Sequence, residues 1–438
     1  MADGGRRASL PRRDTGPFSM LGVTWTDASA RVGGTVEVRT RSAESGTWSA
    51  WLRLDADSGR GENGAARGGT EPVWVGPSDG VEARLRAADG ATSDRLPSGL
   101  RLDMIDPGSG RATAMEPAAF AVEETPAPAD ATEPTGGQTS ATGPRAAEAD
   151  PEEPGAEGAT REPGPGVSAG PSGAPVPSAP PRGTPVPSAS GSPSPTAAVR
   201  VPPGPPSGVP RPPITSRAGW GADESISPEE PGYLPGGRIR AVVVHHTAES
   251  NAYTCEQAPA VVRGIYAYHV QQLGWKDIGY NFLVDKCGTV YEGRKGGVDR
   301  PVLGAHAYGF NSETTGISVL GAYTDAAPSQ AAMASVAQVV AWKLGRYGVD
   351  PAGTATLTAG ASGRSYAGRT WASGARLSFP AVHGHRDGYN TRCPGDALYD
   401  RLATIRSWAA GPVAGLASGP SRAQGWAVRP TTPGPASR

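Results

Sequence analysis

Val242-Val243-Val244-His245-His246-Thr247 is an apolar, β-branched run that ends in two histidines. A run of this kind predicts a buried strand that delivers a side chain to the rim of a sheet. Adjacent strand residues face opposite sides of a sheet, so only one of the two imidazoles should reach a given site. The other then packs or hydrogen-bonds elsewhere. The alternative is that both are ordinary strand residues with no ligand role.

Two further stretches near the C-terminus carry good zinc ligands. They are His383-Gly384-His385-Arg386-Asp387 and Thr391-Arg392-Cys393-Pro394-Gly395-Asp396, on either side of a short polar loop. The spacing of His385 and Cys393 is not that of a standard structural zinc site, so this pair alone is a weak signal. Together with His245 it supports our central hypothesis, that these three side chains bind one Zn²⁺ and leave its fourth position to water. Such an open site is the catalytic kind.

The composition limits what the chain can be. It has 438 residues, enough for two or three domains, but only 37% are hydrophobic and 107 are Gly or Pro (62 and 45), so much of it cannot be packed core. A net charge of −1 and a pI near 6.6 do not indicate nucleic acid as a partner. No apolar run approaches the about 20 residues of a membrane span. The start is basic, and no apolar segment of a secretory signal follows it.

Residues 17–107 predict a small all-β accessory domain, which we expect to be a sandwich. Alternating apolar and charged residues are typical of half-buried strands, and Gly-rich turns separate the runs. The strands are predicted at 18–25, 35–41, 48–54, 72–76, 81–87 and 100–105. This segment contains no His and no Cys, so we assign it no chemistry. Its tryptophans could form a carbohydrate-stacking face, but large aromatics are mostly core filler, and we favour that interpretation for Trp25, Trp48, Trp51 and Trp74.

Two segments have a composition that cannot form a packed core. Residues 108–213 are rich in Pro, Ala and Gly and predict a long disordered tether, extended and partly polyproline II. Residues 412–438 are similar and predict a disordered tail.

Residues 214–411 contain every histidine of the chain and predict an α/β domain, with a central mixed β-sheet flanked by helices. The strands are expected at 239–246, 281–285, 289–292 and 316–320, the middle two as a hairpin. Helices are expected at 257–273 and 329–347, with a last helix capped by Asp396. His269 lies on an apolar helix face and is expected to be a core histidine. For His383 we favour a core or surface role.

Three cysteines are present. If Cys393 binds metal, Cys255 and Cys287 remain to form a disulfide, which would favour an oxidising, extracellular setting. The alternative is two buried thiols. His306 lies in a Gly-rich loop before Asn311, where a substrate contact is one of two open interpretations, because loops beside a cleft often carry binding residues.

Residues 214–411 resemble the peptidoglycan-recognition-protein family, also called type 2 N-acetylmuramoyl-L-alanine amidases. The matching stretches occur in family order and span nearly the whole segment. They are 216–222, 244–248, 277–284, 290–294, 304–306 with Asn311, 316–318, 384–387 and 393–396. The β domain and tether are similar to accessory regions of secreted actinobacterial members.

The resemblance implies hydrolysis of the amide between the lactyl group of N-acetylmuramic acid and L-alanine, in a groove that holds a peptidoglycan muropeptide. It places the Zn²⁺ ligands at His245, His385 and Cys393, and active-site residues at Tyr280 and Thr391. His306, Asn311 and His246 are our candidates for substrate binding. We expect a monomer, outside the cell or associated with the cell wall.

Two other functions use the same residues. Some family members lack a ligand and only bind peptidoglycan, but this chain keeps all three ligand positions with Tyr280 and Thr391, which disfavours binding without catalysis. A zinc peptidase acting on the stem peptide would share the metal site and differ only in its substrate contacts.

Overall fold

The computed structural model describes residues 7–30, 32, 34–56, 62, 65–87, 96–108, 118–121 and 208–411. All of these belong to one compact unit. Most of the predicted tether and the whole predicted tail, 412–438, lie outside the described residues. The helices in the described ranges are too short or too polar to cross a membrane.

The N-terminal part is all-β, as predicted. Its strands are β1 (Arg7–Trp25), β2 (Gly34–Ser42), β3 (Leu52–Leu54), β4 (Gly68–Gly69), β5 (Val73–Ala87), β6 (Arg101–Ile105) and β7 (Ala118–Ala121). They pair in the order β3-β2-β5-β1-β6-β7, with β4 on β1. The expected sandwich is therefore wrong for the described strands, which form one sheet. The turn predicted between 76 and 81 does not form: β5 continues through this segment, with a φ of 73° at Gly76 and register shifts against β1.

The four tryptophans of this β domain divide into two pairs. Trp25 and Trp74 are buried, with 2% and 5% of their surface exposed, so the core interpretation is right for them. Trp48 and Trp51 are half-buried instead. The guanidinium of Arg39 lies 5.7 Å from the Trp48 ring centroid and 4.8 Å from that of Trp51, so a cation covers these rings.

The C-terminal part, here called the α/β domain, is built on a mixed sheet, as predicted, and the sheet has five strands. The strands are β8 (Ala241–His246), β9 (Phe282–Val284), β10 (Val290–Glu292), β11 (Thr314–Val319) and β16 (Val382–Gly384), in the order β10-β9-β11-β8-β16. β8 is parallel to both neighbours, and the predicted hairpin β9–β10 is antiparallel. Gly384 stands opposite Val244, so the residues that follow β8 and β16 meet at one edge of the sheet.

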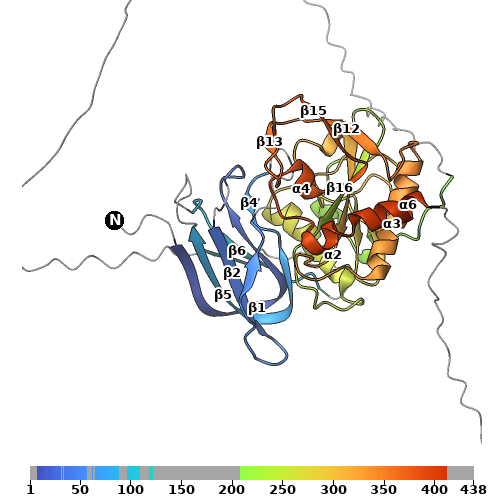
Figure 1. Cartoon of the computed structure of the whole chain (residues 1–438). Coiled ribbons are helices and arrows are strands. Elements are labelled where there is room, and N and C mark those ends of the chain that lie inside the picture. The colour runs from blue at the N-terminus through green and yellow to red at the C-terminus, as the bar shows by residue number, and fades with distance from the viewer. Residues whose placement is uncertain are drawn as a thin grey trace, which may run out of the picture. The chain divides into compact units, whose positions relative to one another are not determined.

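Helices cover both faces of this sheet. Helices α3 (Gln330–Gly345) and α6 (Leu402–Ala410) pack side by side against one apolar face (Figure 1). Helix α2 (Ala258–Ala267), which continues as the π-helix Tyr268–Gln272, packs with a second cluster. The remaining short elements are α1 (Arg217–Trp220), η1 (Glu224–Ile226), η3 (Asn311–Glu313), α4 (His385–Gly388), α5 (Asp396–Tyr399), β12 (Thr354–Thr358), β13 (Gly363–Arg364), β14 (Thr370–Trp371) and β15 (Arg376–Pro380).

The start of the last helical segment differs from the prediction. Asp396 is not an N-cap: Gly395 takes that position, and Asp396 is the first residue of α5. The carboxylate of Asp396 instead pairs with Arg386 and, at 3.0 Å, with Arg392. Its role is to tie together the two sides of the loop that carries Cys393.

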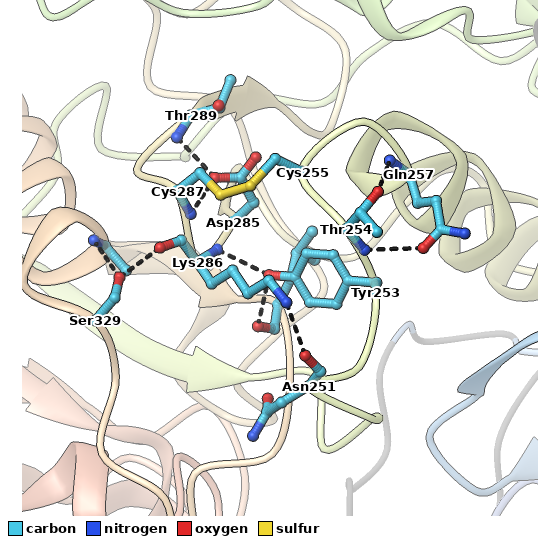
Figure 2. The surroundings of a disulfide bond; sticks show 12 residues. Asn251, Tyr253, Thr254, Cys255, Gln257, Asp285, Lys286, Cys287, Thr289 and Ser329 are labelled. Atoms are coloured by element: carbon cyan, nitrogen blue, oxygen red, sulfur yellow. Dashed lines mark hydrogen bonds between the residues drawn. A yellow bond between two sulfur atoms is a disulfide. The ribbon is translucent and has the colours of Figure 1, made fainter.

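The predicted disulfide is present. Cys255, just before α2, is bonded to Cys287 in the turn of the β9–β10 hairpin (Figure 2). Beside it, Tyr253 Oη accepts a hydrogen bond of 2.8 Å from the backbone N–H of Lys286, whose ammonium lies 4.7 Å from the Tyr253 ring centroid. The bridge thus anchors the start of α2 to the hairpin.

Candidate metal centre

The three predicted ligands come together at the edge where β8 and β16 end. His245 is near the end of β8, His385 begins α4 directly after β16, and Cys393 lies in the loop before α5. One potential ligand atom from each falls within 4.8 Å of the other two. Cys393 Sγ is 3.7 Å from His245 Nδ1. All three side chains are buried, so the neighbouring strands and loops hold them in place.

The donor set fits a zinc ion. Burial, and next the neighbouring His385, hold the pKa of His245 well below its ordinary value of 6.5, and burial lowers the pKa of His385 to about 3. Both imidazoles are therefore neutral, as metal ligands must be. His385 Nε2 is buried and has no hydrogen-bond partner among the described residues. Burial raises the pKa of the Cys393 thiol, which a bound cation would reverse. Two imidazole nitrogens and a thiolate are ligands that Zn²⁺ prefers.

A small cavity opens beside the three predicted ligands. Tyr280 lines it and is 5% exposed. The Tyr280 ring centroid lies 5.3 Å from that of His245. Burial keeps the pKa of Tyr280 well above 10, so its hydroxyl stays protonated and can donate a hydrogen bond at neutral pH.

His246 and His306 border the same cavity. Only His245 of the adjacent pair belongs to the ligand cluster, as the alternation along β8 predicts, but both imidazoles reach the cavity. His246 Nδ1 accepts a hydrogen bond of 3.2 Å from the backbone N–H of Tyr323. His306 Nδ1 lies 3.1 Å from His245 Nε2. This contact orients the His245 ring, as groups behind a metal ligand commonly do.

The other two candidates lie just behind the cavity. Asn311 Oδ1 accepts hydrogen bonds from the backbone N–H groups of His306 (2.9 Å) and Ala307 (2.7 Å), and so holds the loop that presents His306. Thr391 Oγ1 accepts a bond of 3.1 Å from the backbone N–H of Cys393. Neither side chain is among those that line the cavity.

The remaining polar residues near the centre have structural roles. His269 is buried, stacks on Trp275 with ring centroids 4.3 Å apart, and accepts a bond from the Gly279 N–H. His383 stacks on Phe379 in the core. Both core interpretations agree with this placement.

Two acids that the sequence did not indicate line the cavity, namely Asp55 and Glu71. Both belong to the β domain, to which we had assigned no chemistry because it lacks His and Cys. The cavity therefore draws its wall from both domains. Glu71 Oε1 accepts a hydrogen bond of 3.5 Å from Tyr280 Oη. Only their place in the fold marks these acids, because neither stands in a recognisable motif.

Comparison with known proteins separates the same two parts. Residues 235–396 match the family described as N-acetylmuramoyl-L-alanine amidase, and residues 2–135 match that described as Rv3811 N-terminal galactose-binding domain-like. Peptidoglycan-recognition protein SC2 of Drosophila simulans is 30% identical over 198 residues, 45% of this chain and 88% of that protein.

A human relative, N-acetylmuramoyl-L-alanine amidase, is 35% identical over 164 residues, 37% of this chain and 23% of that protein. The solved structure of Drosophila PGRP-LB is 24% identical and is matched over 44% of this chain and 92% of its own, with a TM-score of 0.33. The motifs and the extended match to protein SC2 lead to one conclusion: the chain belongs to the peptidoglycan-recognition-protein and type 2 N-acetylmuramoyl-L-alanine amidase family.

Proposed function

We propose that this chain is a zinc-dependent hydrolase that cleaves the amide between the lactyl group of N-acetylmuramic acid and L-alanine in peptidoglycan. Membership of the family supports peptidoglycan binding or amidase activity. The observation that carries the step to hydrolysis is the buried cluster of His245, His385 and Cys393 beside a cavity lined by Tyr280. A protein that only binds the polymer does not need three metal ligands next to its cavity.

His245, His385 and Cys393 would hold the zinc ion. When bound, Zn²⁺ lowers the pKa of a water molecule towards about 7 and polarises a carbonyl, which addresses both the poor nucleophile and the poor electrophile of amide hydrolysis. His306 keeps the His245 ring oriented through the 3.1 Å contact. Burial by the surrounding strands keeps both imidazoles neutral.

Tyr280 would donate a hydrogen bond to the attacking water or to the oxyanion that develops on the lactyl carbonyl oxygen. Thr391 would help to hold the same oxygen. Its Oγ1 already accepts from the Cys393 N–H, and this bond leaves the hydroxyl proton available for donation. His246, His306 and Asn311 are proposed to contact the muropeptide, His246 and His306 from the cavity wall and Asn311 through the loop it supports.

The substrate and the disulfide fit a place outside the cell or on the cell wall, which we propose for this protein together with a monomeric state. A disulfide such as Cys255–Cys287 persists mainly in an oxidising environment.

Product analysis tests the proposal. Purified muropeptide and whole peptidoglycan are incubated with the wild type and with Cys393→Ala, and the products are identified by mass spectrometry while the zinc content of both proteins is measured. We expect the wild type to release stem peptide that begins at L-alanine, with the lactyl group intact on the glycan. The variant should lose zinc and activity. Chelation of the wild type should abolish cleavage, and added Zn²⁺ should restore it.

Two results would contradict the proposal. Binding of peptidoglycan by a zinc-loaded wild type without any cleavage would make the chain a binding protein. Cleavage within the stem peptide would make it a zinc peptidase.

A further inference from the structure

The cavity beside the metal ligands has an uneven distribution of acids. The side of the cavity that belongs to the α/β domain is lined by imidazoles, a thiol, aromatic rings and an alanine. The carboxylates among its described lining residues are Asp55 and Glu71, and both come from the β domain. The α/β domain alone would therefore present a cavity wall without a carboxylate among the described lining residues.

Amide hydrolysis needs a group that moves a proton. One proton must leave the attacking water, and one must reach the amine nitrogen as the carbon–nitrogen bond breaks. Four imidazoles are among the described lining residues of the cavity: two belong to the proposed metal ligands, His306 is engaged with one of these, and His246 Nδ1 is engaged with the backbone of Tyr323. A carboxylate that reaches the same cavity is the remaining kind of side chain suited to this step.

Glu71 lies where such a group is required. Its Oε1 is 3.5 Å from the Oη atom of Tyr280, whose ring lies beside His245. Glu71 thus adjoins the hydroxyl that we assign to the water or oxyanion. Asp55 is the neighbouring acid: its backbone oxygen accepts a hydrogen bond of 2.8 Å from the Glu71 N–H.

Side-chain and backbone groups of the α/β domain hold the backbone next to Glu71 in place. Tyr268 Oη, on a fully buried ring of the π-helix, donates a hydrogen bond of 3.0 Å to the carbonyl oxygen of Thr70. A Cβ atom at Gly69 would lie 2.7 Å from Leu273 Cδ2, so the chain passes closer to this helix than a side chain would allow. The backbone N–H of Ala66 donates to the Leu273 carbonyl oxygen at 2.9 Å.

An apolar cluster surrounds these contacts. The cluster contains residues from both domains: Met20, Trp74 and Ile105 of the β domain are buried with Tyr268, Leu273 and Ile278 of the α/β domain. Separation of the two surfaces would expose this apolar area to water, which is unfavourable. The position of Glu71 at the cavity is therefore a stable feature of the packed protein.

We propose that Glu71 of the β domain is a catalytic residue of the amidase, and this inference rests on the function proposed above. As the water oxygen bonds to the lactyl carbonyl carbon, one water proton passes to the Glu71 carboxylate. The carbon–nitrogen bond then breaks, and the same proton passes from Glu71 to the amine nitrogen of L-alanine. The carboxylate is regenerated, the second water proton leaves with the new carboxylic acid, and no oxidant or reductant is involved.

The test compares three full-length proteins: the wild type, Glu71→Gln, and the matched control Asp55→Asn, which neutralises the neighbouring acid. kcat and KM are measured on a purified muropeptide, together with zinc content and muropeptide binding by calorimetry. We expect Glu71→Gln to lower kcat by about 10²- to 10⁴-fold, the usual contribution of a general acid–base group, with KM, zinc content and binding unchanged. Asp55→Asn should lower kcat by less than about tenfold.

Several outcomes would overturn the inference. Wild-type kcat in Glu71→Gln would show that Glu71 moves no proton, and a higher kcat would show that the β domain obstructs the site. A fall in kcat with loss of zinc or of muropeptide binding would give Glu71 a structural role. These results leave the amidase function standing, whereas an inactive, zinc-loaded wild type would remove both proposals.

Discussion

The two domains contribute to one cavity in different ways. The α/β domain contains all six histidines and all three cysteines, and its three proposed metal ligands lie at the ends of its own strands and in the loop before α5. The β domain has neither residue type, yet it supplies both of the cavity's described acids. A cluster of proposed metal ligands can thus belong to one domain while part of the cavity wall beside it depends on packing between domains. If that is right, changes at the domain contact should lower stability without altering any of the proposed ligands.

The strongest contact to break is a buried ion pair. Glu62 Oε1 of the β domain lies 2.7 Å from Arg294 Nη2, and the two side chains are 14% and 8% exposed. Glu62 Oε2 also accepts a hydrogen bond of 2.6 Å from the Lys276 N–H. Removing one partner leaves the other charge buried, so Glu62→Ala should lower the free energy of unfolding by about 3 kcal/mol. Urea denaturation, followed by tryptophan fluorescence, measures this.

An exposed pair within the β domain provides the control. Arg12 is 56% exposed and lies 3.3 Å from Glu82, so Arg12→Ala should change the free energy of unfolding by less than about 1 kcal/mol. Equal stability of Glu62→Ala and Arg12→Ala would mean that the Glu62–Arg294 pair is not buried in solution. The two domains would then not be joined at this point.

Most of the α/β domain could be predicted, because the sequence patterns that specify its strands and helices are local. The β-branched run 242–244 forms the buried strand β8, and Ser329 caps α3, accepting a bond from the Ala332 N–H. The clustering of His245, His385 and Cys393 was predictable for the same reason, since each stands in a short motif. The predicted pairing of Cys255 with Cys287 also followed once Cys393 was assigned to the metal.

The role of the β domain could not be predicted, because it depends on contacts between distant positions. Glu71 precedes a strand and stands in no motif. The hydrogen bond that fixes its neighbour Thr70 comes from Tyr268, 198 residues away. From the sequence, Tyr268 is one more aromatic residue at the end of a helix, and nothing marks Thr70 as its partner.

A buried acid between the domains provides a second way to test the contact. Glu249 of the α/β domain is 1% exposed. Its carboxyl group accepts hydrogen bonds from Thr247 Oγ1, at 2.9 Å, and from the backbone of Trp74 in the β domain. Burial raises the pKa of Glu249 from 4.5 to about 8. The folded protein therefore holds a proton that the unfolded chain releases above about pH 4.5.

Stability should consequently fall as pH rises from about 4.5 to about 8, because the unfolded state binds fewer protons there. Glu249→Gln keeps the shape of the side chain and removes the titration. We expect its stability relative to the wild type to rise by about 2 kcal/mol between pH 5 and pH 7. Urea denaturation of both proteins across this range measures the difference, and the exposed Glu44→Gln is the control. If the difference in the free energy of unfolding between Glu249→Gln and the wild type does not change with pH, Glu249 is ionised in the folded protein.

The smallest expected effect concerns close packing between β1 and the π-helix. A Cβ atom at Gly22 would lie 2.6 Å from the ring of Tyr268, and the hydrogen bond of Tyr268 to Thr70 keeps that ring from moving aside. Gly22→Ala should therefore cost about 1 kcal/mol and lower the Tm. Gly16 lies in the same strand, and an added Cβ atom there would meet nothing within 4 Å, so Gly16→Ala should leave the Tm unchanged or slightly higher. Differential scanning calorimetry distinguishes the two variants. Both variants add one methyl group to β1, so a fall in Tm that is confined to Gly22→Ala comes from the surface of β1 that faces the α/β domain. Equal Tm values would show that β1 does not pack against the π-helix.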